Sequence, residues 1–382
     1  MDVIVIGGGV IGLGVAWQLA QAGVRVRLLM RGQVGDGTTS AAAGILPPAR
    51  WDTACDAIDR LRGQSHQLFP AWSDAIRSAT GIDIGLRQCG GIYLAEKPGE
   101  AAALAGAVEY WHDYGITAER LSADQLVARV PQLESWAKSP RFRTAVWVPD
   151  EWQVRPPDLL RGLAAACVAA GVEMVEGVAV GLRRRGDRAI IESASGDLAG
   201  VPAGAKIVLC GGVWTGQIAE RFGLGLSLVP IRGQMLLYRL NRRPFASVIN
   251  EGQRYLVPRD DGCLLVGSCE EEVGFEAGTT AEMLAMLQTW AVGVFPELSE
   301  VSPIDRWSAL RPATFDGFPI IGRMPEVENL WIAAGHFRSG VHLAPATAKL
   351  VAALIRNEPP EVDPAAFAVG RLLTRQPHGT TP

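Results

Sequence analysis

Short apolar runs, a glycine-rich turn and a helical repeat follow one another at the start of the chain. Asp2 to Ile6 is short, β-branched and bounded by glycine, which predicts a buried strand of a parallel sheet. Apolar residues then recur at helical spacing from Leu13 to Ala22, Gly23 ends this helix, and residues 24–29 alternate as a second strand. The pattern predicts a β-α-β unit, which normally needs about 30 residues.

Later segments switch between helical periodicity and strand-like alternation. Helices are predicted over residues 54–80, 98–130 (with an N-terminus near Ser122 or Ala123), 156–170, 279–295 and 344–355. Strands are predicted over residues 84–95 (as a pair), 144–148 and 330–334. Residues 172–210 are predicted to alternate between strands and turns, and residues 228–266 to be rich in strands, with a hairpin from Tyr255 to Val266. The chain thus begins and ends with strand–turn–helix units around a mainly antiparallel centre.

This order of elements predicts an α/β fold with two domains. We expect a Rossmann-like nucleotide-binding domain built from separated segments, with an inserted substrate domain that holds a mainly antiparallel sheet. The predicted bounds are 1–84, 144–226 and 308–370 for the first domain, 85–143 and 227–307 for the second, and 371–382 for a C-terminal tail.

Composition narrows the class of protein. The 48% hydrophobic and 20% charged residues exclude a disordered chain, and the 44 glycines show no Gly-X-Y period, which excludes collagen. A net charge of −4 argues against nucleic acid as a partner. Six cysteines without a Cys-x-x-Cys pair fit neither a metal site nor a disulfide framework and indicate a reducing compartment. Without a signal peptide or an apolar run of about 18 residues, we expect a cytoplasmic protein without stable membrane insertion.

The turn after the first strand carries the motif Gly7-x-Gly9-x-x-Gly12 between a strand and a helix, where a dinucleotide site requires it. Gly7 permits the tight turn, Gly9 lets the backbone approach a pyrophosphate, and Gly12 lets helix and strand pack closely. The helix N-terminus then offers free amides to the phosphates.

One element of a dinucleotide site is missing. The acid that normally binds the ribose at the end of the second strand is replaced by Met30, followed by Arg31. Methionine cannot accept the two ribose hydrogen bonds, whereas Arg31 suits the adenosine edge or a phosphate. On these residues alone, Arg31 could also bind the 2′-phosphate of a cofactor, so NADP stays an alternative.

Several segments share one resemblance. Thr38 to Leu46 resembles the flavin-approach loop of the D-amino-acid oxidase superfamily, and within it is most similar to the glycine oxidases of thiamine biosynthesis. The other matching segments are 206–214, 255–259, 307–312 with 316–322, and 335–347. The resemblance runs in order from residue 2 to about residue 356.

The resemblance implies FAD bound without a covalent link. The predicted cofactor contacts are Gly7, Gly9, Val10, Ile11, Gly12, Met30, Arg31, Thr38, Thr39, Ala43, Gly44, Ile45, Val180, His336, Phe337, Arg338, Ser339, Gly340, Val341 and His342. The turn from Gly335 to Gly340 is expected to aim backbone amides and a helix N-terminus at the pyrimidine side of the flavin, where they stabilise negative charge. His336 and His342 are expected to pack in this loop rather than act as acid or base, and no metal is expected.

The resemblance also assigns the substrate site. Arg311 binds the carboxylate of an amino acid, for which a planar guanidinium is the best partner, Tyr255 donates its hydroxyl, and Arg338 lies at the substrate. A neutral amine then loses its α-hydrogen as hydride to flavin N5 without a protein base, and dioxygen reoxidises the flavin to yield hydrogen peroxide. The implied function is a glycine oxidase, also acting on sarcosine or small D-amino acids, that supplies an imine to a thiazole synthase, with a homo-oligomer expected.

Two alternatives stay open: a dehydrogenase that uses an electron acceptor other than oxygen, and a non-enzymatic or decayed flavoprotein, which Met30 alone favours. A further departure affects specificity. Related glycine oxidases have an apolar pocket residue where this chain reads Ser268-Cys269-Glu270. If Glu270 faces the pocket, it hinders anionic substrates or favours cationic ones; if it faces solvent, it changes nothing.

Overall fold

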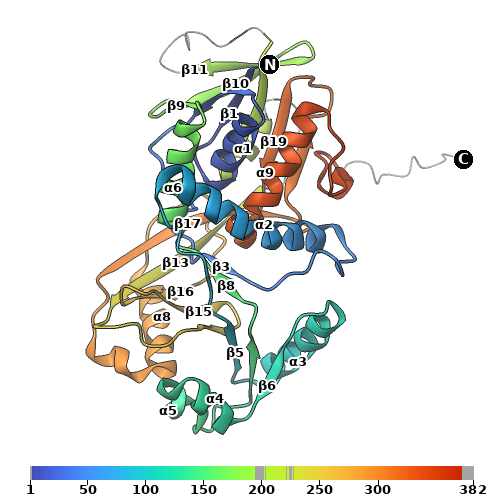
Figure 1. Ribbon diagram of the computed structural model, residues 1–382. Coiled ribbons are helices and arrows are strands. Elements are labelled where there is room, and N and C mark those ends of the chain that lie inside the picture. The colour runs from blue at the N-terminus through green and yellow to red at the C-terminus, as the bar shows by residue number, and fades with distance from the viewer. Residues whose placement is uncertain are drawn as a thin grey trace, which may run out of the picture.

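The computed structural model describes residues 2–193, 202, 204–220, 222, 226 and 228–371. Of the predicted tail, 371–382, only Arg371 lies within the described residues. Figure 1 shows two stacked parts. The first and last segments of the chain meet in the upper part, while the middle of the chain forms most of the lower part.

The upper part contains a six-stranded sheet. In spatial order its strands are β18 (Ile320–Arg323), β19 (Leu330–Ala334), β12 (Lys206–Leu209), β1 (Asp2–Ile6), β2 (Arg25–Leu29) and β9 (Glu173–Val175). Neighbouring strands from β19 to β9 are parallel, and β18 runs antiparallel to β19.

Both faces of this sheet are covered, which explains the continuous apolar sequence of β1. Val3 and Val5 pack into a core shared with four helices, whereas Ile4 and Ile6 point to the opposite face. The helices are α1 (Val10–Gln21), α2 (Ala57–Thr80), α6 (Pro156–Ala169) and α9 (Gly340–Arg356), of which α1 contacts α6 and α9. The hairpin of β10 (Val180–Arg185) and β11 (Arg188–Ser193) packs its apolar residues into the core of the other face.

The lower part contains an eight-stranded sheet. In spatial order its strands are β17 (Asp305–Thr314), β13 (Leu228–Arg239), β16 (Cys263–Gly267), β15 (Arg254–Pro258), β14 (Val248–Glu251), β5 (Gly91–Ala95), β7 (Thr144–Val148) and β6 (Glu119–Leu121). All neighbours are antiparallel except β14 and β5. The predicted hairpin is confirmed, with Leu256 opposite Val266.

Shorter elements complete the fold. A three-stranded sheet joins β3 (Ile45–Leu46), β8 (Trp152–Gln153) and β4 (Arg87–Gln88). The other helices are α3 (Pro98–Asp113), α4 (Ala123–Arg129), α5 (Glu134–Ala137), α7 (Thr215–Glu220) and α8 (Ala281–Val294), with short 3-10 turns η1 (Pro131–Leu133), η2 (Gly212–Trp214), η3 (Pro296–Glu300), η4 (Phe337–Ser339) and η5 (Pro364–Phe367). Within the described ranges, no helix has both the length and the apolar character of a membrane span.

The predicted α/β fold is confirmed, and two local predictions are wrong. Residues 84–95 form two strands that do not pair with each other, because the Cys89 and Gly90 amides bind the Glu151 carbonyl and the chain passes from one sheet to another. Residues 98–130 are not one helical stretch: α3 ends at Asp113, and the three-residue strand β6 is too short for its periodicity to be read. Ser122 caps α4 as expected, by accepting a hydrogen bond from the Gln125 amide.

The predicted domain bounds stay a prediction, and the sheets suggest two changes. Residues 144–148 and 308–314, allotted above to the nucleotide-binding domain, are paired in the eight-stranded sheet. Strand β17 in particular follows β13 over its whole length. We therefore propose that β7 and β17 belong to the substrate domain.

The larger sheet buries a carboxyl group that makes stability depend on pH. Glu151 is fully buried, and its carboxylate accepts hydrogen bonds from the Tyr93 hydroxyl and, at 3.0 Å, from Asn250 Nδ2. Burial outweighs these bonds and raises the pKa of Glu151 from 4.5 to about 7. Between those two pH values the unfolded chain releases the proton and the folded chain keeps it, so stability falls as the pH rises.

We expect Glu151→Gln to weaken this pH dependence. The wild-type free energy of unfolding should fall by about 3 kcal/mol on account of this group between pH 5 and pH 8, and glutamine should remove that loss. Urea unfolding at both pH values checks the result, with the exposed Glu119→Gln on β6 as control. Equal pH dependence of all three proteins would show that Glu151 is ionised equally in both states.

Candidate active site

The glycine-rich turn between β1 and α1 has the geometry of a phosphate cradle. Gly7 has φ of +120°, and a Cβ there would overlap the Cys210 carbonyl. A Cβ on Gly12 would overlap the Gly7 carbonyl oxygen, so α1 approaches β1 as closely as glycine allows. Gly9 is the N-cap of α1 and leaves the helix start without a side-chain cap, although Thr39 Oγ1 accepts the Val10 amide at 3.2 Å. These features fit the pyrophosphate of FAD.

The position predicted to face the ribose is apolar. Met30 follows β2, is 4% exposed, and its sulfur lies over Gly8, where a Cβ would be 2.6 Å away. Its backbone is fixed by the amide of Val178 and the carbonyl of Val175. Arg31 stacks on the Trp214 ring, with the guanidinium carbon 4.5 Å from the ring centre. Trp214 was not predicted as a site residue, although it ends one of the matching segments.

We expect Met30→Glu to tighten FAD binding about tenfold, because it restores an acceptor for a ribose hydroxyl. Met30→Leu keeps the apolar side chain and should leave the affinity unchanged. Fluorescence titration of the apoprotein with FAD measures both variants. Equal affinity of the glutamate and leucine variants would refute the role assigned to this position.

The predicted flavin-approach loop, Thr38 to Leu46, is held by hydrogen bonds to residues distant in the chain. Thr38 Oγ1 donates to the Leu310 carbonyl at 2.7 Å. Gly44 has φ of +72°, and its carbonyl accepts the Val154 amide at 2.8 Å. Arg259 donates to the Ala43 carbonyl at 2.6 Å.

Arg259 is a structural residue of the site that sequence reasoning missed. It is buried, donates also to Gln153 Oε1 at 2.6 Å and to the Val154 carbonyl at 2.8 Å, and therefore ties β15 to both β8 and the flavin-approach loop. Burial lowers its pKa to about 10. Its place at the end of the matching segment 255–259 is the sequence feature that could have identified it.

The turn between β19 and α9 presents a second uncapped helix start. Gly335 has φ of +77° and Phe337 has φ of +47°, which bend the chain into η4. Helix α9 begins at Gly340, and its N-cap Ser339 makes no side-chain capping bond. The amides of this turn thus fit the predicted place beside an electron-rich flavin edge.

The two histidines of this turn are buried. His336 lies 3.1 Å from Thr347 Oγ1, and burial lowers its pKa to about 3. His342 lies 3.3 Å from His66 Nδ1, and burial lowers its pKa as well. Both are neutral near pH 7, which favours the predicted packing role. Ser339 and His342 also line a small cavity of about 160 Å³ that reaches Tyr110 and Pro47.

The proposed substrate residues lie around one segment, Gly267 to Glu270. On β17, Arg311 donates to the Cys269 carbonyl at 2.9 Å and to Ser268 Oγ at 2.7 Å. On β15, Tyr255 lies opposite Gly267. Arg338 comes from η4 and forms an ion pair with Glu270.

Gly233 on β13 was also missed by sequence reasoning. A Cβ at this position would overlap the guanidinium of Arg311. Because Gly233 has no side chain, the guanidinium of Arg311 on the neighbouring strand has room at this position. A single glycine inside a strand pattern is a known sign of such close approach.

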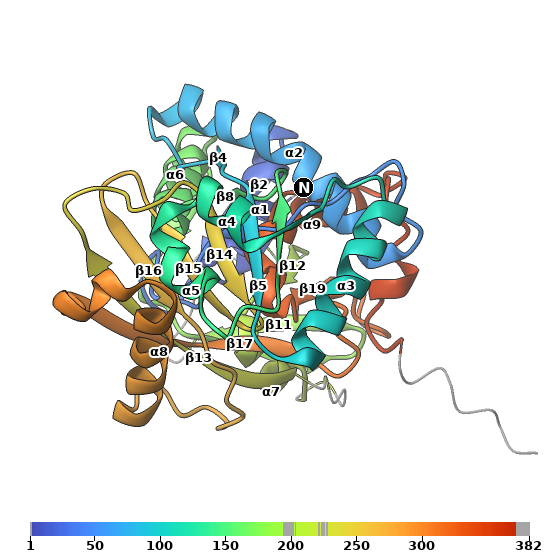
Figure 2. The same cartoon turned by 90° about the horizontal axis from the view of Figure 1, so that it is seen from below.

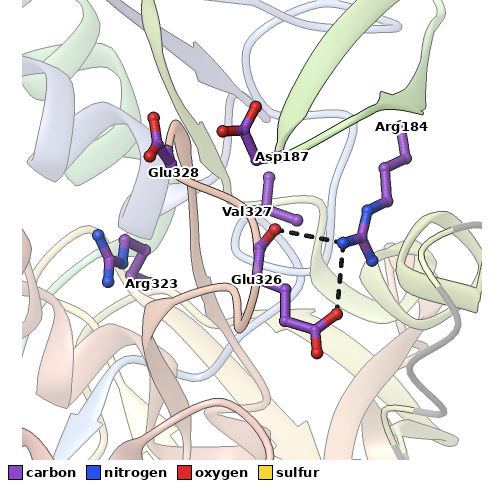
Figure 3. Close-up of a pocket in the computed structure, with 6 residues that line it drawn as sticks. All are labelled: Arg184, Asp187, Arg323, Glu326, Val327 and Glu328. Carbon is purple, nitrogen blue, oxygen red and sulfur yellow. Dashed lines mark hydrogen bonds and ion pairs between the residues drawn. The ribbon is translucent and has the colours of Figure 1, made fainter.

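A hollow of about 430 Å³ is lined by residues other than the predicted site residues (Figure 3). It is lined by Arg184, Asp187, Arg323, Glu326, Val327 and Glu328. Arg184 Nη2 bonds the backbone and the carboxylate of Glu326, at 3.4 and 3.3 Å. None of the predicted site residues lines this hollow, so we do not assign the chemistry to it.

Together, the parallel sheet, its glycine turn and the second uncapped helix fit a dinucleotide-binding protein. Comparison with known proteins agrees. The model of the DAO family, "FAD dependent oxidoreductase", matches residues 2–354. The chain therefore belongs to this family of FAD-dependent oxidoreductases.

Similar proteins align with nearly the whole length of this chain. A glycine oxidase of Pseudomonas aeruginosa is 34% identical over 97% of this chain and 99% of its own length. The crystal structure of glycine oxidase from Geobacillus kaustophilus has a TM-score of 0.89 at 31% identity, covering 98% of this chain and 99% of that one. A bifunctional protein ThiO/ThiG of Trichormus variabilis is 30% identical over 93% of this chain, which spans 52% of its length.

Proposed function

We propose that this protein is a glycine oxidase. It converts glycine, and sarcosine or small D-amino acids, to the imine or 2-oxo acid, with dioxygen reduced to hydrogen peroxide. The observation that carries the proposal is the placement of Arg311, which donates to Ser268 and Cys269. Tyr255 and Arg338 contact the same segment at its two ends, Gly267 and Glu270. The similarity to glycine oxidases supports the substrate.

The residues of this chain would bind and orient the substrate. Arg311 takes the carboxylate as a planar bidentate partner, and the Tyr255 hydroxyl donates to the same group. Burial lowers the pKa of both His336 and His342, which makes them weak bases, so we assign neither as general base. FAD, held at the Gly7–Gly12 turn and the two helix starts, supplies the hydride acceptor when bound. The uncapped amides of α9 would stabilise negative charge beside it.

A panel of amines with a peroxide readout tests the proposal. Glycine, sarcosine and small D-amino acids should yield peroxide with the FAD-loaded protein. A dye-coupled rate far above the oxygen-coupled rate would instead identify a dehydrogenase. Lack of turnover with every amine would refute the proposed function.

We also propose that the product feeds a thiazole synthase in the cytoplasm. The similarity to the bifunctional protein ThiO/ThiG, of whose length this chain spans about half, supports such a partner. All six cysteines lie within the described ranges and are free thiols, which fits a reducing compartment. A thiazole synthase given glycine and its other substrates should form thiazole when this chain is present, and loss of the product without this chain would test the partnership.

A further inference from the structure

Arg338 is engaged by a carboxylate next to the proposed substrate site. One oxygen of Glu270 forms an ion pair with Arg338 Nε, and the other accepts a hydrogen bond from Gln253 Nε2 at 2.9 Å. The Glu270 side chain is 23% exposed, so solvent reaches it only in part. Glu270 thus joins the turn before Tyr255 to the turn before α9.

Arg311 has a different set of partners. Its guanidinium binds a hydroxyl oxygen and a backbone carbonyl, on Ser268 and Cys269, and both are uncharged. These residues immediately precede Glu270 in the chain. The two arginines and Glu270 together carry a net charge of +1, which matches a substrate with one carboxylate.

We propose that Glu270 is a specificity-determining residue that selects amines with a single carboxylate. This inference rests on the proposed function. Glu270 keeps the guanidinium of Arg338 from serving as a second carboxylate partner, and its own charge repels a second carboxylate. A dicarboxylate amine such as iminodiacetate meets this repulsion, whereas glycine does not.

Glu270→Gln tests the proposal, because it removes the charge and keeps the shape. The ratio of kcat/KM for iminodiacetate to kcat/KM for glycine should rise about tenfold or more, as expected for one freed charge-assisted hydrogen bond. Glu272→Gln makes the same charge change at an exposed position two residues on and should leave the ratio at its wild-type value. An unchanged ratio in Glu270→Gln would overturn the proposal.

A second measurement does not depend on turnover. Thiodiacetate and (methylthio)acetate lack the amine and differ by one carboxylate, and their binding to the FAD-loaded protein is read from the flavin spectrum. Glu270→Gln should tighten thiodiacetate about tenfold relative to (methylthio)acetate. Equal changes for both ligands would overturn the proposal.

The double variant with Arg338→Met identifies the group that Glu270 controls. In the Arg338→Met background, Glu270→Gln should favour the dicarboxylate less than it does with Arg338 present, because only the relief of the Glu270 repulsion remains. A gain of the same size in both backgrounds would show that Glu270 does not act through Arg338. If the wild-type protein oxidises no amine, the proposed function fails, whereas the two-ligand titration still decides the role of Glu270.

Discussion

Replacing Arg311 by methionine is expected to lower kcat/KM for glycine about 100- to 1000-fold. The substrate carboxylate would lose its bidentate partner in a partly buried site, which costs several kcal/mol in comparable charge pairs. The loss should appear mainly in KM, because the substrate carboxylate is bound before the chemical step. The guanidinium also fills the space left by Gly233 and binds Ser268 and Cys269. Steady-state kinetics with a peroxide readout measures it.

The matched control lies on the same strand. Arg306 is an exposed residue of β17, and Arg306→Met makes the same substitution away from Ser268 and Cys269. Its kinetics should equal those of the wild type. A similar loss in both variants would mean that β17 has been perturbed and that Arg311 has no specific role.

Gly12→Ala should nearly abolish FAD retention. The new methyl group would overlap the carbonyl oxygen of Gly7, which is backbone and cannot rotate away. Overpacking of this kind costs about 3 kcal/mol, the upper end of its usual range, and should weaken FAD about 100-fold. The ratio of flavin to protein absorbance after gel filtration measures the loss.

Gly106→Ala provides the control for this variant. Gly106 is exposed on α3, and a Cβ there meets no atom within 4 Å. Alanine also has the higher helix propensity, so this variant should keep its FAD and gain slightly in stability. Full FAD retention by Gly12→Ala would contradict the close packing of α1 against β1.

The parts of the fold that the sequence predicted are those set by local pattern. The apolar run of β1 and the hairpin of β15 and β16 appear where expected. A strand buried on both faces gives a continuous apolar run, and Gly262 marks the turn between the two hairpin strands. The Gly7–Gly12 turn was predictable as well, since Gly7 and Gly12 each lie too close to neighbouring backbone to carry a side chain.

The sequence did not predict which distant segments of the chain contact each other. The residues of β4 give no sign that they pair with β8, and the three-residue β6 is too short to show a period. At the site, Arg259 reaches the carbonyl of Ala43 from a distant strand, and Glu270 meets Arg338 across two turns. Such contacts depend on the assembled fold, which a single sequence pattern does not encode.

The most direct test mixes the FAD-loaded protein with glycine in the absence of oxygen. The yellow flavin absorbance should bleach, and admission of oxygen after removal of free glycine should restore it with one peroxide formed per flavin. Glycine binding that perturbs the spectrum without bleaching it, or no response to glycine at all, would contradict the claim that this site oxidises glycine.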